Sequence, residues 1–156
     1  MLKAVRKKSF AAADASFTIV ASEYNGEYVD SMLRAARAVL KRARAKSVRV
    51  IRVPGAFEIP VVVGHIARTS ANPVSAFICL GVILRGQTVH AAYIGEGVSR
   101  ALMELQLQHE IPIVHEVLLL ENHEQARARC LDPNHNRGTE AAQTALAMAQ
   151  VMQSLR

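Results

Sequence analysis

The stretch SAFICLGVIL, residues 75–84, decides the fold because it is apolar almost throughout. A strand that presents apolar residues on both faces is typical of the centre of a parallel sheet that helices cover on both sides. Segments with a strand-like period and segments with a helix-like period alternate along the rest of the chain. This alternation predicts right-handed β-α-β crossovers, and hence a three-layer α/β sandwich with a parallel sheet of about four strands.

The hydrophobic period assigns the other elements. Besides 75–84, the predicted strands are 17–22, 48–53 and 111–119. The predicted helices are 27–46, 58–68, a segment that follows Thr88 and reaches about residue 109, 122–130 and 139–156. Residues 58–68 are rich in β-branched side chains, but their length and their position before another strand favour a helix. The sequence DPNHNRG (132–138) contains Pro, Asn and Gly and indicates a loop.

We expect one domain, residues 17–156, preceded by a basic N-terminal arm, residues 1–16, that is flexible or pairs with a neighbouring subunit. The arm has no continuous apolar stretch of the kind that a secretory signal needs. No apolar run in the chain approaches the roughly 20 residues of a membrane span, so we expect no membrane partner. Cys79 and Cys130 are expected to be reduced thiols, which favours a cytoplasmic location.

Basic residues are concentrated in one part of the chain, whose formal net charge is +6. Between Asp30 and Glu58 there is no acidic residue, and the basic stripe there consists of Arg34, Arg37, Lys41, Arg42, Arg44, Lys46, Arg49 and Arg52. Such a stripe can attract polyanions, but a solvated helix face is the simpler interpretation. No aromatic residue lies between Tyr28 and Phe57 to stack on bases, so we do not expect nucleic acid as a partner.

The last predicted helix is apolar on more than one face. Ala142, Ala145, Leu146 and Ala149 share one face, and Ala141, Met148, Met152 and Leu155 share another. In a domain of this size one apolar face packs on the sheet, and a second is typical of a contact with another subunit. We therefore expect a homo-oligomer.

Three polar stretches follow predicted strands at one edge of the sheet: SEYNGEY (22–28), VPGAFEIP (53–60) and RGQTVH (85–90). Ligands of parallel α/β sheets bind at this carboxyl edge. In the third stretch, Gly86 permits close backbone approach, and Thr88 leads into a helix whose first N–H groups lack partners within the helix. Such a helix start binds anions, and His90 in its first turn can shuttle a proton near neutral pH. This stretch fits a phosphate that leaves during a reaction, although a capped helix with an incidental histidine is an equally simple interpretation.

The other two stretches suit a different part of a ligand. Glu58 is stabilised by the dipole at the head of its predicted helix, and its carboxylate also suits the hydroxyl groups of a polyol. Tyr24 offers a face for a planar heterocycle, although an aromatic at the edge of the core is an equally simple interpretation. Because the three stretches meet at one edge, the sequence predicts a binding site there.

The motifs VPGAFEIP (53–60), LGVILRGQTVHAAYI (80–94) and NRGTEAAQTALAM (136–148), in this order and spacing, resemble the lumazine synthase family of riboflavin biosynthesis. The resemblance implies a flavodoxin-like fold and a transferase that joins 5-amino-6-(D-ribitylamino)uracil to 3,4-dihydroxy-2-butanone 4-phosphate. It implies neither a metal nor a cofactor. It also implies pentamers, assembled in some members into icosahedral shells, with each active site at the interface of two subunits.

The resemblance assigns roles to individual residues of this chain. It implies that His90 is the catalytic, proton-transferring residue and that Gln87, Thr88 and Arg129 bind the phosphate. The substrate-binding residues it implies are Tyr24, Ala56, Phe57, Glu58, Val82, Ile83, Leu84 and His115. Arg129 alone would be interpreted as a charge on a helix surface, and only the resemblance assigns it to the site.

The chain departs from the usual family pattern on its last predicted strand. His115 stands where family members usually place Phe against the heterocycle of a neighbouring subunit's site, and Glu116 stands where Gly is common. Leu119 and Leu120 occupy positions that are often Thr. Two alternatives therefore stay open: a flavin- or lumazine-binding relative without turnover, and a polyanion-binding protein that uses the basic stripe. An archaeal-type riboflavin synthase is a further alternative of the same fold.

Overall fold

The computed structural model describes residues 12–156, which form a sheet of four parallel strands in the order β2-β1-β3-β4. The strands are β1 Ser16–Ser22, β2 Ser47–Val53, β3 Ala76–Leu84 and β4 Ile113–Leu120. The helices are α1 Gly26–Arg42, the short 3₁₀ helix η1 Ala56–Glu58, α2 Ile59–Thr69, α3 His90–His109, α4 His123–Cys130 and α5 Arg137–Ser154. The predicted three-layer α/β fold of the flavodoxin-like type is confirmed.

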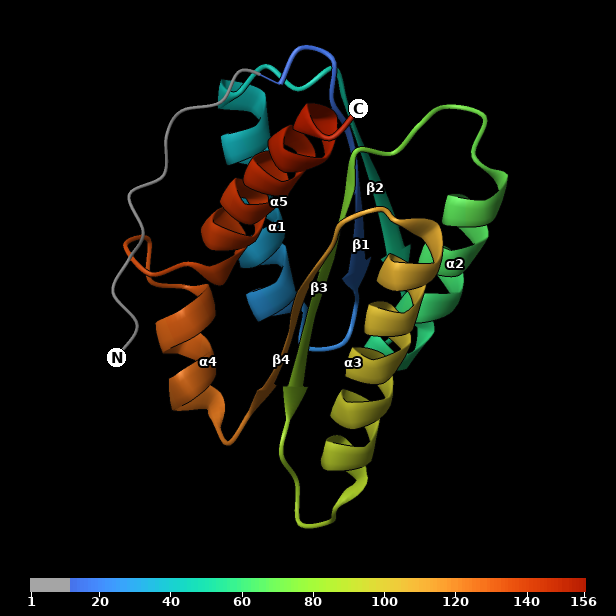
Figure 1. The fold of residues 1–156 in the computed structure, drawn as a ribbon. Coiled ribbons are helices and arrows are strands. Elements are labelled where there is room, and N and C mark those ends of the chain that lie inside the picture. The colour runs from blue at the N-terminus through green and yellow to red at the C-terminus, as the bar shows by residue number, and fades with distance from the viewer. Residues whose placement is uncertain (1–11) are drawn as a thin grey trace.

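The sheet separates two hydrophobic cores. Helices α1, α4 and α5 cover one face and α2 and α3 cover the other, as Figure 1 shows. Successive residues of a strand point to opposite faces, so Ile78 and Leu80 of β3 pack in the first core while Phe77 and Cys79 pack in the second. Residues 76–82 are all buried, as the apolar stretch predicts.

Two predicted helix boundaries are wrong for local reasons. Helix α1 ends at Arg42 and not at 46, because Arg44 adopts a left-handed conformation with φ of 58° and its N–H bonds to the Lys41 carbonyl. Helix α5 begins at Arg137, inside the predicted loop 132–138, because the Asn136 side chain accepts a hydrogen bond from the Gly138 N–H and caps the helix.

Helices α1, α4 and α5 meet in a cluster of hydrogen bonds that we call the α4–α5 junction. The Asn136 amide donates to the Cys130 carbonyl at 2.8 Å, and the Ser31 hydroxyl donates to the same oxygen at 2.6 Å. At Gly138, α5 and α1 are so close that a Cβ atom would overlap the main chain of Met32. The junction fixes the end of α4 against the first and last helices.

The ends of the predicted domain are described in part. Residues 1–11 of the predicted arm lie outside the described residues, so the boundary at 16/17 stays a prediction. Ala12 and Ala15 are buried, and the Ala12 N–H donates to the Ala43 carbonyl at 2.8 Å. Within residues 12–156, no helix has the length and apolar character needed to cross a membrane.

The cysteines and the basic stripe are placed as follows. Cys79 and Cys130 are both buried and free. Most basic-stripe side chains are exposed on α1, on β2 and on the loop between them. Arg52 is paired with Asp30 at 2.7 Å, so part of the positive charge of the stripe is neutralised.

Candidate active site

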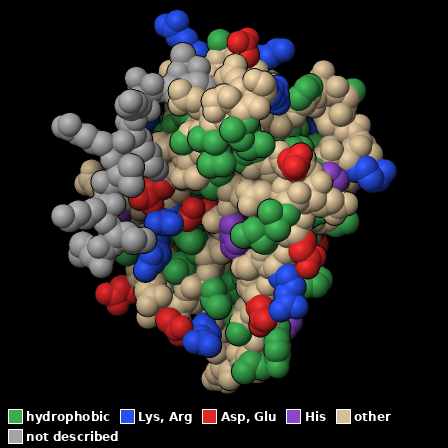
Figure 2. All heavy atoms as spheres, viewed as in Figure 1, with side chains coloured by type: hydrophobic (Ala, Val, Ile, Leu, Met, Phe, Trp, Pro, Cys, Tyr) green, Lys and Arg blue, Asp and Glu red, His purple; other side chains and the backbone are tan. Residues whose placement is uncertain are grey.

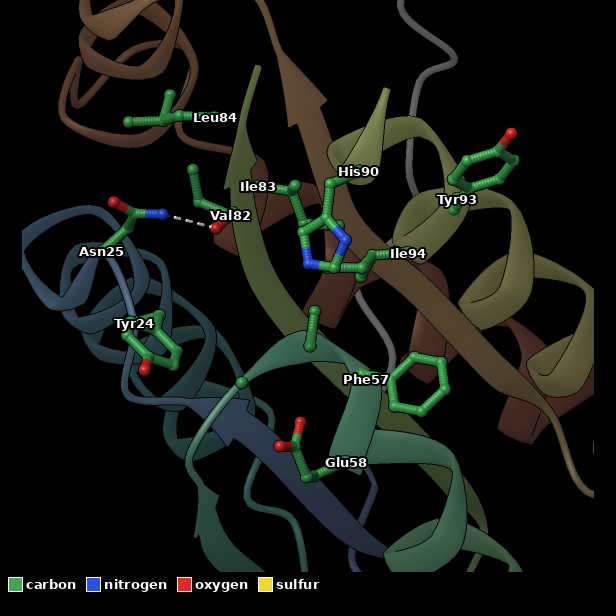
Figure 3. Close-up of a pocket in the computed structure, with 12 residues that line it drawn as sticks. Tyr24, Asn25, Phe57, Glu58, Val82, Ile83, Leu84, His90, Tyr93 and Ile94 are labelled. Carbon is green, nitrogen blue, oxygen red and sulfur yellow. Dashed lines mark hydrogen bonds between the residues drawn. The ribbon is translucent and has the colours of Figure 1, made fainter. Parts of the chain in front are cut away.

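A cavity of about 530 Å³ opens at the carboxyl edge of the sheet, beyond β1, β2 and β3. Its lining contains the predicted residues Tyr24, Ala56, Phe57, Glu58, Val82, Ile83, Leu84 and His90. It also contains Asn25, Gly55, Tyr93 and Ile94. Figure 3 shows Tyr24 and Asn25 across the opening from His90 and Ile94, with Glu58 below them. Three separate polar stretches therefore meet in one cavity, as the strand order requires.

The loop after β1 is tied to both neighbouring strands. Asn25 has φ of 56°, a left-handed conformation that Asn tolerates better than most residues. This conformation lets its side-chain amide donate to the Val82 carbonyl of β3 at 2.7 Å. On the other side, the Tyr24 N–H donates to the Pro54 carbonyl at 3.1 Å. These two bonds hold the largely exposed Tyr24 ring at the mouth of the cavity.

Gly55 lines the cavity between the side chains of Tyr24 and Glu58. A Cβ atom there would lie 3.2 Å from Glu58 Oε2 and 3.3 Å from Tyr24 Cδ2. Without a side chain at this position, the aromatic ring and the carboxylate approach the same stretch of backbone. Within residues 12–156 the Glu58 carboxylate makes no hydrogen bond or ion pair, so its oxygens can accept the hydroxyl protons of a ligand.

His90 is the first residue of α3, and its ring faces the middle of the cavity in Figure 3. Its N–H donates to Thr88 Oγ1 at 3.4 Å, and the N-cap residue of α3 is Val89, which offers no capping side chain. Gln87 and Thr88 are exposed on the loop that leads into α3 but do not line the cavity. The loop and the helix start lie at the rim, where an anion would meet free N–H groups.

His115 and Arg129 lie outside the cavity of their own chain. His115 is exposed in the middle of β4, the edge strand, and Arg129 is exposed in the last turn of α4 on the opposite face of the sheet from α3. The structure of one chain thus brings eight of the predicted residues together in the cavity and places Gln87 and Thr88 at its rim. His115 and Arg129 lie apart from this group.

Both ring nitrogens of His115 have partners. Val117 N–H donates to Nδ1 at 3.1 Å, and Nε2 lies 2.7 Å from the Ser99 hydroxyl of α3. Packing against α3 removes part of the hydration of the ring, and this lowers the pKa of His115. The ring is therefore neutral at pH 7.

Glu116 points to the other face of β4 and is buried. Its carboxylate accepts a hydrogen bond from Arg137 Nε at 2.8 Å, and Arg137 also pairs with Glu140 at 2.8 Å. Burial alone would lower the pKa of Arg137, but the bond and charge of Glu116 raise it above its usual value. The unusual carboxylate on β4 thus anchors the α4–α5 junction.

Sequence reasoning missed four lining residues. Gly55 lies within the motif VPGAFEIP, and Asn25 precedes the Gly that opens α1. Tyr93 and Ile94 follow His90 by three and four positions, so the helical period alone places them on its face. Ile94 faces the cavity, whereas the Tyr93 ring points away from its centre in Figure 3.

A metal centre is not assembled by the described residues. Within residues 12–156, no three His, Cys, Asp or Glu side chains lie together in a way that could hold a metal ion. A larger hollow of about 980 Å³ lies at the opposite, amino edge of the sheet and contains none of the predicted site residues.

Two comparisons with known proteins identify the family of this chain. The family model described as 6,7-dimethyl-8-ribityllumazine synthase matches residues 14–153. The chain is also 39% identical over 142 residues to the 6,7-dimethyl-8-ribityllumazine synthase of Aquifex aeolicus, which covers 90% of this chain and 91% of that protein. The chain therefore belongs to the 6,7-dimethyl-8-ribityllumazine synthase family, the transferases of riboflavin biosynthesis that the sequence motifs resemble.

Proposed function

We propose that this chain condenses 5-amino-6-(D-ribitylamino)uracil with 3,4-dihydroxy-2-butanone 4-phosphate to give 6,7-dimethyl-8-ribityllumazine, phosphate and water. One observation carries the proposal: a single cavity in a chain of this family gathers the Tyr24 ring, the Glu58 carboxylate and the His90 imidazole. An aromatic face, a polyol acceptor and a proton carrier are what this pair of substrates requires.

The uracil substrate fits between the Tyr24 ring at the mouth of the cavity and the Glu58 carboxylate. The Tyr24 ring stacks on the heterocycle, and the backbone of Ala56 and Phe57 with the apolar end of β3 surrounds it. The Glu58 carboxylate accepts hydrogen bonds from the ribityl hydroxyls. Support for this placement comes from the free carboxylate and from Gly55, which leaves room between Tyr24 and Glu58.

The butanone phosphate fits the rim. The loop at Gln87 and Thr88 and the start of α3 offer N–H groups to the phosphate, and Arg129 supplies a bidentate guanidinium. The amine of the uracil condenses with the ketone, phosphate is eliminated, and the ring closes. His90 lies between the two binding regions and moves protons in the elimination and ring closure.

Oligomers complete the proposed site. His115 and Arg129 serve the cavity of a neighbouring subunit in a pentamer, and pentamers assemble further into an icosahedral shell. Exposed apolar side chains support association between copies: one side of α3 and its N-terminal turn exposes Val89, Tyr93, Met103 and Leu107, and α5 exposes Val151 and Leu155. Figure 2 shows hydrophobic side chains between charged ones on one face of the molecule. A native mass equal to that of a bare pentamer would contradict the shell.

The remaining expectations are part of the same proposal. Residues 17–156 form one catalytic domain, and residues 12–16 of the predicted basic arm pack on it, since Ala12 and Ala15 are buried. We place the enzyme in the cytoplasm, which the two free, buried cysteines support. Its partners are the two small substrates and other copies of the chain.

The test is to mix the purified protein with both substrates and follow lumazine absorbance. We expect formation well above the uncatalysed rate, and a fall in kcat on the order of 10² in His90→Ala. Product that appears no faster than without protein would contradict the proposal.

A second candidate function rests on His115 and Glu116. A lumazine- or flavin-binding relative would keep the cavity and lose turnover, and the departures on β4 favour it more than any other alternative. It predicts tight binding of 6,7-dimethyl-8-ribityllumazine with no synthesis, so the same assay together with equilibrium binding of the product separates the two functions.

A further inference from the structure

The hydrogen bonds of His115 fix its tautomer. A backbone N–H can only donate, so Nδ1, which faces Val117 N–H at 3.1 Å, carries no proton. The neutral ring must then carry its proton on Nε2 and donate it to Ser99 Oγ at 2.7 Å. The Ser99 hydroxyl in turn donates a hydrogen bond to the Gly95 carbonyl at 2.7 Å. The chain of bonds from β4 to α3 sets both the protonation and the plane of the ring.

No charged side chain is hydrogen-bonded to this imidazole among residues 12–156. On β3 its register partner is Cys79, a thiol that burial keeps neutral by raising its pKa. On α3 the nearest charged residues in sequence to Ser99 are Glu96 and Arg100, which pair with each other at 3.6 Å and are largely exposed. On β4 itself, Glu116 points to the other face of the sheet. The ring is thus a neutral, oriented surface.

We propose that Ser99 is a positioning residue that holds His115 as the neutral Nε2–H tautomer, with its ring set to contact the uracil heterocycle bound in a neighbouring subunit. The inference rests on the proposed function, in which His115 binds substrate. A family position usually filled by Phe, which needs no orienting partner, is here filled by a smaller ring with two polar atoms. Val117 is the hydrogen-bond partner of Nδ1, and Ser99 is the partner of Nε2.

Protonation would undo this arrangement. A proton on Nδ1 would face the Val117 N–H, so the ring would lose that hydrogen bond and turn. The uracil substrate would then meet a charged ring in a different plane. Binding of this substrate, and not of the butanone phosphate, is therefore the quantity that reports on the Ser99–His115 pair.

The experiment compares Ser99→Ala, Ser99→Thr and unsubstituted full-length protein. We expect Ser99→Ala to raise KM for the ribitylaminouracil about fivefold, the effect of one lost hydrogen bond, with kcat and KM for the butanone phosphate unchanged. Ser99→Thr keeps the hydroxyl and restores KM. Ser154→Ala is the matched control, because Ser154 makes a similar bond to a helix carbonyl, Val151, but has no histidine partner.

A double-mutant cycle removes purely structural explanations. In a His115→Phe background, Ser99→Ala should have no effect on KM, because Ser99 then has no ring to hold. An unchanged KM in Ser99→Ala, or the same increase in the His115→Phe background, would overturn the proposal.

A measurement independent of activity separates this inference from the proposed function. The nitrogen chemical shifts of His115 report its tautomer, and we expect the Nε2–H form with a ring that becomes mobile in Ser99→Ala. An Nδ1–H tautomer in the unsubstituted protein would overturn the role of Ser99 even if lumazine is made. If the unsubstituted protein neither makes lumazine nor binds the uracil substrate, the proposed function is contradicted. The role of Ser99 in substrate binding is then contradicted as well.

Discussion

The cavity and the β4–α4 edge both carry residues assigned to the site, but they are built in different ways. The cavity consists of loop residues at strand ends, held together by bonds such as Asn25 to Val82. At the β4–α4 edge, His115 and Arg129 lie within regular elements, on opposite faces of the sheet, and point to no cavity of their own chain. In the pentamer that we propose, each chain would offer the cavity as a receiving half and the β4–α4 edge as a contributing edge, which is the arrangement of a heterologous interface.

The largest expected effect comes from separating the two halves in one assembly. His90→Ala disables the cavity and Arg129→Ala disables the contributing edge, so each variant alone should lose activity on the order of 10²-fold. Co-assembly of equal amounts should restore about one quarter of full activity, because an interface with both intact halves forms with that frequency. The measurement is the lumazine rate of co-expressed and of separately purified, mixed variants.

If both residues served the same chain, no mixed interface would contain an intact site, and co-expression would give no recovery. Separately purified variants that do not exchange subunits provide the control, since they should stay inactive after mixing.

A second, smaller effect is the loss of stability when a methyl group is added at the α4–α5 junction compared with the cavity rim. Gly138→Ala should lower the free energy of unfolding by about 2–3 kcal/mol, because the added Cβ overlaps the main chain of Met32 and pushes α5 away from α1. Gly86→Ala, on the loop at the cavity rim, should change it by less than about 0.5 kcal/mol, since no atom lies within 4 Å of the added carbon. Urea unfolding curves measure both. Equal stabilities of the two variants would contradict the close approach at the α4–α5 junction.

The smallest expected effect is the pH dependence at the contributing edge. The unfolded chain binds a proton at His115 with a pKa of about 6.5, and the folded chain binds it less readily because its pKa is lowered. Between the two values the unfolded state holds more protons, so stability is full above pH 6.5 and falls as pH falls through the folded pKa. The loss should stay below about 1 kcal/mol, since the residue is exposed. His115→Phe should remove this part of the pH dependence of urea unfolding.

Much of the fold and of the cavity is predictable because its signals are local. The apolar stretch 75–84 marks a doubly covered strand, and the parallel order of strands then brings the three polar stretches to one edge. The wrong prediction of where α1 ends also has a local cause. Arg44 ends α1 in a conformation usually taken by Gly or Asn, so its side chain gives no warning of the helix end.

The contributing edge was less predictable because its contacts join distant segments. Ser99 and His115 are on different elements, and neither residue type demands the other. Glu116 looks like a solvent-exposed departure until Arg137, from the start of α5, is seen to bind it. The close approach of Gly138 to Met32 likewise depends on how α1 and α5 cross, which no single segment encodes.

The strand order also has a consequence for the time course of folding. A sheet ordered β2-β1-β3-β4, with every pair parallel, contains no hairpin, so each strand must wait for a complete crossover before it finds a neighbour. The first core needs α5, residues 137–154, to cover α1. The chain must lose the entropy of loop closure before such distant contacts stabilise it, so the domain should fold slowly for its size. During synthesis the cavity residues, which lie between 24 and 94, emerge well before α5, so apolar strands of the nascent chain stay exposed until that helix is made.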